Sequence, residues 1–322
     1  MKNQIKYILL LTLVIALTFT GCDDAIYPKG DLDNQYVLSC VLNGDTSYQV
    51  AFLTKTYDVD GFDPYSNDVN PSVDDAQVVL LYNGLTYYFR DTVVTTLEDS
   101  RYPGGKHYYY LNNFTPAPNQ DAILEARMQD GTIINSEIRT FPYKLREGSF
   151  YRSDFLAPPE NPLQNTLLFK WGDYAQTVYF IPVLSIEYSK TINGVEYRRS
   201  KLVPQMIENG EQLFPGLQTG DHISYNLDAF DYAFESIAED GVAREDYKIY
   251  HAVFKVLITD EYLATYYSAS NTFSDSFTIL VTEPEYTNIN GGLGMFGSFV
   301  SNKIQVTINR NYTEAYGYSV GE

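Results

Sequence analysis

Short runs of alternating apolar and polar residues, separated by turn residues, make up the chain from residue 36 onward. Residues 36–42 and 47–53 alternate in this way on either side of Asn43-Gly44-Asp45, a combination typical of a β-hairpin. Further strands of this length are expected at 76–82, 85–90, 107–111, 122–128 and 132–140. Because no helical periodicity interrupts them, residues 36–142 are predicted to form an immunoglobulin-like β-sandwich domain.

The second half of the chain shows the same strand-length runs and adds two helical patterns. A proline-rich stretch at 157–162 marks the change of domain, since proline is excluded from the interior of a sheet. Strands are expected at 166–171, 177–188, 195–203, 222–226, 247–258, 277–281 and 303–308. Apolar residues recur at helical spacing over 227–237 and again over 262–267. The prediction is therefore a mainly β protein of two β-sandwich-like domains, the second (143–322) with two short helical insertions.

The charge of the chain narrows the choice of partners. Acidic residues outnumber basic ones by 41 to 22, and the formal net charge is −19. Nucleic acid requires a basic face, and anionic lipid would repel such a chain, so neither is expected to bind by charge. The 30 tyrosines and 18 phenylalanines favour β structure, because aromatic side chains pack well on a pleated surface.

The first 22 residues have the pattern of an export signal. Two lysines precede an apolar run at 7–17, which is too short for a membrane span of about 20 apolar residues. A basic start, a short apolar core and small residues before a cleavage site are typical of a secretory signal. Cys22 directly follows Gly21, and this stretch resembles the lipobox of bacterial lipoproteins, with Phe19 where leucine is commoner.

We therefore expect residues 1–21 to be a signal peptide and residues 22–35 to be a lipidated tether. The thiol of Cys22 would carry a diacylglycerol and its freed amino group a further acyl chain such as palmitate, and two or more chains anchor a protein stably. The alternative is an ordinary cleaved signal, or an uncleaved anchor, in which Cys22 is incidental. With Cys22 lipidated, Cys40 has no partner in the chain, so it is predicted to be a small buried side chain.

One acidic loop could hold a metal ion. Asp58, Asp60 and Asp63 gather carboxylate oxygens, and Ca²⁺ takes six to eight oxygen ligands. The spacing does not follow the helix-loop-helix calcium motif, because Phe62 interrupts it. Calcium is therefore one interpretation of this loop, and a solvated acidic loop is the other.

No motif in the chain calls for catalysis. The three histidines, His107, His222 and His251, are scattered and show no metal-ligand spacing. The serine elbow of hydrolases and the phosphate-binding glycine loop are both missing from the sequence. We therefore expect the protein not to be an enzyme and to need no cofactor apart from the possible calcium.

Aromatic residues form three local sets. These are Tyr108-Tyr109-Tyr110, Tyr87-Tyr88-Phe89, and Tyr262 with Tyr266 and Tyr267. Alternation along a strand places one ring in the core and the next outside, which accounts for most of them. The outward members are candidates for a partner-binding face, because amphipathic rings are enriched at interfaces.

A glycine-rich segment near the C-terminus is the most distinctive stretch. It contains Asn288, Gly291, Gly292, Gly294, Met295 and Phe296. Glycines permit positive φ and close backbone approach, so the segment is interpreted as a bent, packed connection before the last strand. A loop pressed against a partner is the alternative.

The same segment resembles the C-terminal motif of a Bacteroidota outer-membrane lipoprotein family catalogued as a domain of unknown function. The Cys22 start, the hairpin at 36–53 and the helix at 260–268 are similar as well. Asp23-Asp24 resembles the acidic signal that sends such lipoproteins to the cell surface. Asp91-Thr92-Val93 resembles the sequon that exported Bacteroidota proteins glycosylate, which makes Thr92 a candidate O-glycosylation site.

The resemblance implies a function in nutrient uptake. Members of the family are often encoded beside TonB-dependent receptors, so the leading hypothesis is an accessory or binding subunit of such a transporter. The protein would be anchored by outer-membrane lipid through Cys22, on the cell-surface side. A stand-alone surface lipoprotein that binds glycan or protein, or an adhesin, is the alternative, and a hydrolase is a third.

Overall fold

The structure is a computed structural model that describes residues 34–59, 63–94, 105–145, 150–151, 156–158, 164–172, 178–192, 194–238, 243–271 and 286–321. The expectations for Cys22, Asp23, Asp24, Asp60 and the strand at 277–281 lie outside these residues. Within them the protein is mainly β, as predicted, and contains three α-helices.

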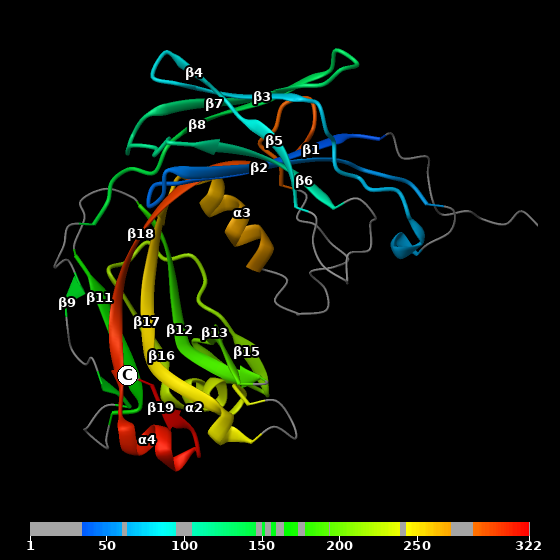
Figure 1. Cartoon of the computed structure of the whole chain (residues 1–322). Coiled ribbons are helices and arrows are strands. Elements are labelled where there is room, and N and C mark those ends of the chain that lie inside the picture. The colour runs from blue at the N-terminus through cyan, green and yellow to red at the C-terminus, as the bar shows by residue number, and fades with distance from the viewer. Residues whose placement is uncertain are drawn as a thin grey trace, which may run out of the picture.

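Two sheets packed face to face form the first unit (Figure 1). One layer has the strand order β4 (Leu85–Tyr88), β3 (Gln77–Tyr82), β7 (Asp121–Arg127) and β8 (Ile133–Arg139). The other contains β1 (Tyr36–Asn43), β2 (Tyr48–Lys55), β6 (Lys106–Asn112) and β5 (Arg90–Val94). Alternate side chains, such as Leu38, Leu53, Leu80, Tyr109 and Leu124, meet between the layers and form the first hydrophobic core. This is the sandwich-like arrangement expected from the alternating pattern.

Turn residues fix the hairpins of this unit. Asn83 and Gly84 connect β3 to β4 with φ values of 51° and 74°. Both residues of a type I′ turn need positive φ, which Asn-Gly supplies at little steric cost. The turn therefore sets the register in which Tyr82 pairs with Leu85.

The second unit is built on long strands of the same large sheet. These strands are β13 (Val195–Val203), β12 (Tyr179–Ile192), β17 (Tyr247–Thr259) and β18 (Leu293–Ile308). A smaller sheet of β16 (His222–Asn226), β11 (Thr166–Trp171) and β9 (Phe150–Tyr151) packs on them. Between the layers lies the second hydrophobic core, in which the rings of Phe169 and Phe254 stack with centroids 4.0 Å apart.

Short elements complete the two units. They are β10 (Leu156–Ala157), β14 (Met206–Glu208), β15 (Glu211–Leu213), β19 (Ser319–Val320), and the 3₁₀ turns η1 (Pro64–Ser66, in the first unit) and η2 (Arg244–Asp246). Helix α2 (Leu227–Glu235) was predicted, and helix α4 (Arg310–Ala315) was not. Phe234 of α2 packs edge-on against Tyr312 of α4, so the two helices close one end of the core.

Strand β18 belongs to both units. Its first part, Leu293–Phe299, pairs in parallel with β1, and its second part pairs antiparallel with β17. The prediction of a bent connection over 291–297 is corrected here: from Leu293 the segment is a strand. Residues 286–299, assigned to the second domain by sequence, add Ile289 and Phe296 to the first core.

Close backbone approach explains the glycines of this segment. A Cβ on Gly292 would lie 2.6 Å from the carbonyl oxygen of Tyr36, and one on Gly294 would lie 2.1 Å from that of Leu38. Gly294 also has a φ of +113°. Glycine is therefore required at positions 292 and 294 for this segment to lie against β1, whereas Gly291, with a φ of 77°, stands in the turn just before β18.

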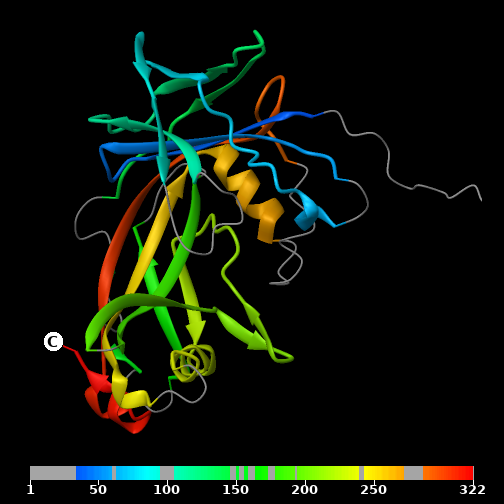
Figure 2. The same cartoon turned by 45° about the vertical axis from the view of Figure 1, so that its right-hand side comes forward.

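Helix α3 (Glu261–Asn271) lies in the angle between the two units, on the side of β1 and β18 that faces away from the first core (Figures 1 and 2). It packs on β18, where a Cβ on Gly297 would come within 2.9 Å of the Cβ of Leu263. Asp260 caps its N-terminus by accepting hydrogen bonds from the amides of Tyr262 (2.8 Å) and Leu263 (3.0 Å). None of the described helices is long and apolar enough to cross a membrane.

Candidate functional site

The outer face of β2 and β6 carries a row of aromatic side chains. We call Tyr48, Phe52, Tyr108 and Tyr110 the aromatic face. The ring centroids are 5.8 Å apart for Tyr48 and Tyr110, 6.4 Å for Tyr110 and Tyr108, and 6.3 Å for Tyr108 and Phe52. Tyr48 and Phe52 are 40% and 39% exposed. The rings therefore form a continuous apolar surface open to solvent.

Strand alternation produces this face, as the sequence indicated. Tyr109 points inward, is 1% exposed, and donates a hydrogen bond of 2.8 Å to the carbonyl oxygen of Val73. Its neighbours Tyr108 and Tyr110 point outward. In the second aromatic set Phe89 is buried and Tyr88 is exposed. The outward members alone are therefore available to a ligand.

Among the described residues, the strand positions that surround the aromatic face carry positive charge and no carboxylate. The outward positions of β1, β2, β5 and β6 include Arg90 and Lys106, and no aspartate or glutamate occupies any of them. The ammonium group of Lys106 lies 4.9 Å from the ring centroid of Phe52, within range of a cation–π interaction. In a chain of net charge −19 this face is locally cationic.

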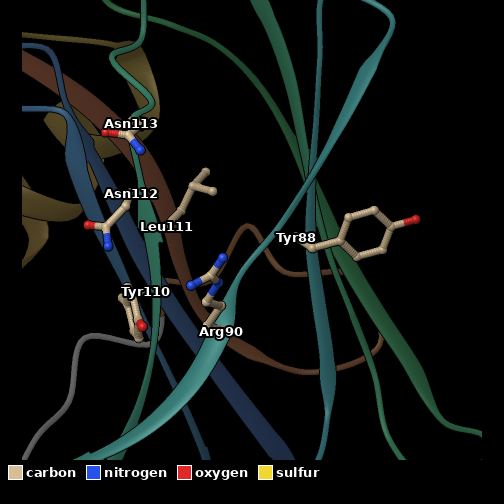
Figure 3. Close-up of a pocket in the computed structure, with 6 residues that line it drawn as sticks. All are labelled: Tyr88, Arg90, Tyr110, Leu111, Asn112 and Asn113. Carbon is tan, nitrogen blue, oxygen red and sulfur yellow. The ribbon is translucent and has the colours of Figure 1, made fainter.

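A small pocket lies at the end of this face (Figure 3). Its volume is about 190 Å³, and its walls come from Tyr88, Arg90, Tyr110, Leu111, Asn112 and Asn113. Figure 3 shows the guanidinium group of Arg90 directed along β6 toward Leu111 and Asn112, while the ring of Tyr88 points away. Among the described residues no carboxylate forms an ion pair with Arg90. The pocket thus presents a guanidinium group and two amides beside an aromatic platform.

A larger apolar groove lies where the two units meet. Its volume is about 530 Å³, and it is lined by β12 and β13, the segment around Phe214 and Pro215, α3, and the outer sides of β1 and β18. Leu202 and Phe214 at its rim are 51% and 45% exposed. The hydroxyl of Tyr267, which lines it, donates to the carbonyl oxygen of Pro215 at 3.0 Å. Apart from that phenol, the side chains of the described lining residues are apolar.

The groove adjoins the aromatic face. Val41 lines the groove, and it lies on the outer side of β1, where Ser39 pairs with Phe52 of β2. Both surfaces are therefore on the same side of the large sheet. A single large partner could contact both.

The glycine-rich segment does not present the side chains considered for a partner-facing loop. Met295 is 6% exposed and Phe296 is fully buried. The side chain of Asn288 donates to the carbonyl oxygen of Phe296 at 2.7 Å and accepts from its amide at 2.9 Å. Gly291, Gly292 and Gly294 lie against the backbone or side chains of neighbouring strands. The residues of this segment therefore pack within the fold.

The two described aspartates of the acidic loop make local hydrogen bonds. Asp63 accepts from the amide of Tyr65 at 2.8 Å and caps η1, and Asp58 accepts from the amide of Val59 at 3.0 Å. No group of three or more His, Cys, Asp or Glu among the described residues is placed to hold a metal ion. Since Asp60 lies outside the description, calcium at this loop stays a prediction.

Thr92 lies on β5, the edge strand of the large sheet, directly opposite Tyr108. Its side chain is half-buried and shares the outer side of the sheet with the aromatic face. A glycan on Thr92 would stand beside these rings, so glycosylation there and ligand binding on the aromatic face would compete for space.

The groups most suited to nucleophilic or acid–base chemistry lie in separate parts of the fold. Cys40 is buried, and burial raises the pKa of its thiol to about 12. His107 lies 3.3 Å from Asp91 on the edge of the sheet, and His222 lies 2.7 Å from Asp221 in the second unit. Burial lowers the pKa of His251 on β17. No carboxylate, histidine or cysteine occurs among the described residues that line the pocket and the groove.

Sequence reasoning missed Arg90 and the groove. Arg90 is the last residue of the predicted strand 85–90, and its charge indicates only that the side chain is exposed. Leu202 and Phe214 belong to different local sequence patterns, and only the fold brings both of them to the rim of the groove. No protein-family model matches the chain, and no curated protein shows significant similarity to it.

Proposed function

We propose that this chain is a lipid-anchored binding protein of the bacterial outer membrane, and that it serves as an accessory or binding subunit of a TonB-dependent nutrient transporter. The lipobox-like stretch ending at Cys22 supports the anchor, and the resemblance at 288–297 supports the kind of partner. The protein lies on the cell-surface side and carries out no catalysis itself.

The observation that carries the proposal is the apolar groove. Soluble proteins rarely leave large apolar surfaces open, and those rimmed by polar residues mark sites of interaction. Here Leu202 and Phe214 stay exposed at the rim of a space of about 530 Å³. The described lining residues carry no charged group, which fits a protein partner that inserts an apolar element. We therefore propose that the transporter docks in this groove.

Crosslinking in intact cells tests this assignment. The full-length protein should crosslink to an outer-membrane barrel that mass spectrometry identifies as a TonB-dependent receptor. Leu202→Asp should reduce that crosslinking by about tenfold or more, since it removes an apolar contact and buries a charge. Leu85→Asp is the matched control, because Leu85 is 61% exposed and lies on β4, in the layer away from the groove. Recovery of the wild-type protein without any barrel would refute the proposal.

The aromatic face favours a second function. Exposed rings beside Arg90, Asn112 and Asn113 suit a carbohydrate or peptide ligand, as a stand-alone surface binding protein would require. Absence of a barrel together with saturable binding of a glycan would favour this alternative.

A further inference from the structure

The aromatic face and the pocket at its end combine two kinds of recognition. Tyr48, Tyr110, Tyr108 and Phe52 offer ring faces in a row with centroid spacings of 5.8–6.4 Å. Arg90, Asn112 and Asn113 offer hydrogen-bond donors at one end of that row. Arg90 pairs with Tyr110 across the ladder, so their side chains leave the sheet on the same side. A ligand lying along the rings would therefore meet the guanidinium group.

The charge of this face selects an anionic ligand. Arg90 and Lys106 both stand on it, and no aspartate or glutamate occupies an outward position of the described strands β1, β2, β5 and β6. A guanidinium group binds planar oxyanions through two parallel hydrogen bonds, and it keeps its charge at all relevant pH values. Because the chain as a whole is acidic, with a net charge of −19, a local pair of cations such as Arg90 and Lys106 favours the approach of an anion at this face.

The size of the pocket indicates an extended ligand. At about 190 Å³ it is smaller than the 300–1,000 Å³ that typically enclose a whole small molecule. One unit of a polymer would fill it, and neighbouring units would lie on the rings. The C–H faces of sugar rings stack on the negative π face of tyrosine, and the two asparagine amides match the hydroxyl groups of a sugar.

We propose that the aromatic face binds an acidic polysaccharide, with the negative group of one sugar, a carboxylate or a sulfate, held by Arg90 and with adjacent sugars stacked on Tyr110 and Tyr48. This goes beyond docking in the groove, because the binding of a glycan on these strands requires no transporter. The competing occupant is an acidic polypeptide, which could also add a strand to the open edge of β5.

Calorimetric titration of the full-length lipoprotein in detergent tests the proposal. The probes are polygalacturonate, a sulfated galactan, neutral amylose and poly-L-glutamate. Binding of at least one anionic glycan is expected to be about tenfold or more tighter than that of amylose, because hydrogen bonds to a charged group are stronger than those between neutral groups. The comparison of polygalacturonate with the galactan shows whether carboxylate or sulfate is preferred.

Two pairs of matched variants locate the site. Arg90→Gln should weaken binding by about tenfold, and Arg90→Lys by less, because lysine keeps the charge and loses the bidentate geometry. Arg310→Gln removes the same charge from α4 in the second unit and should change affinity by less than about twofold, since salt screens distant charges. Tyr48→Ser should weaken binding, whereas Tyr197→Ser, at a similarly exposed tyrosine on β13, should not.

Three results would overturn the proposal. The first is that none of the anionic glycans binds. The second is that Arg90→Gln binds like the wild type. The third is that poly-L-glutamate binds as tightly as the glycans and Tyr48→Ser has no effect, which would assign the face to an acidic polypeptide. The crosslinking experiment at the groove is independent of all three, because its variants lie on other strands.

Discussion

Replacing Asp260 should destabilise the protein more than the loss of an ordinary helix cap does. Asp260 is 4% exposed and stands between β17 and α3. One carboxylate oxygen accepts from the amides of Tyr262 and Leu263, and the other accepts from the amide and the hydroxyl of Ser298 on β18. The hydroxyl oxygen of Ser298 in turn accepts from the amide of Phe141 at 2.8 Å. One carboxylate therefore links α3, β18 and the segment after β8.

The size of the destabilisation follows from the hydrogen-bond donors that lose their acceptor when Asp260 is replaced. Asp260→Ala removes an N-cap, which costs about 1 kcal/mol, and leaves the buried amide of Ser298 without an acceptor, which costs about 1–3 kcal/mol more. We expect the free energy of unfolding to fall by about 2–4 kcal/mol in total. Asp260→Asn can still cap the helix, but its NH₂ group faces two donors of Ser298, so the loss should be about 1–3 kcal/mol.

Urea unfolding measures this difference as a lower midpoint with an unchanged slope. Asn309→Ala is the matched control, because Asn309 caps α4 with a single hydrogen bond of 2.9 Å to the amide of Asn311. That control should cost about 1 kcal/mol. If Asp260→Ala were no more destabilising than Asn309→Ala, the link to Ser298 would contribute nothing and the reasoning would fail.

The pH dependence of Asp260 gives a second test of the same group. Burial raises the pKa of this carboxyl from 3.8 to about 6. Because the folded-state pKa is the higher one, the folded protein binds this proton more tightly, and the resulting stabilisation is complete below about pH 4 and lost as the pH rises through 6. The difference in unfolding free energy between wild type and Asp260→Asn should be larger at pH 4 than at pH 7, by up to about 3 kcal/mol. Equal differences at the two values would contradict the assignment.

Three further predictions concern other parts of the chain. Gly294→Ala should lower the free energy of unfolding, measured in urea, by about 3 kcal/mol or more, because the added Cβ would clash with the carbonyl oxygen of Leu38. Gly216→Ala is the control and should be close to neutral, because the space around Gly216 is open. Cys40 should resist alkylation at pH 8 in the folded protein and react in urea, because burial holds the pKa of its thiol at about 12; rapid reaction of the native protein would contradict this. Cys22→Ala should move the protein from the detergent phase to the aqueous phase, and a variant still bound to membranes would refute lipid anchoring at that residue.

Local pattern was enough to predict most strands and two helices. The hairpin of β1 and β2 and the turn at Asn83-Gly84 follow from alternation and turn chemistry within a few residues. The apolar spacing over 227–237 predicts α2 in the same way. The missed helix α4 has six residues, which is too short for a helical period to stand out.

Long-range pairing could not be predicted in this way. Gly292 and Gly294 carry the same sequence signal whether they form a turn or allow a close approach of two strands, and only the position of β1 decides between the two. The outward rings of Tyr108 and Tyr110 could be predicted from alternation. The position of Arg90 beside these rings could not be predicted. It depends on the pairing of β5 with β6, two strands that a loop separates in the sequence.

The parallel pairing of β18 with β1 has a mechanical consequence. The segment that precedes the fold enters at Tyr36, the first residue of β1, and β1 lies between β2 and β18 in the large sheet. A force applied through the N-terminus therefore acts along the axis of a central strand, and the hydrogen bonds on both of its sides resist at the same time. If a strand at the edge of a sheet were pulled at right angles to its own axis, its hydrogen bonds would break one after another. Since β18 continues into the second unit and pairs there with β17, part of the load is passed on to β17.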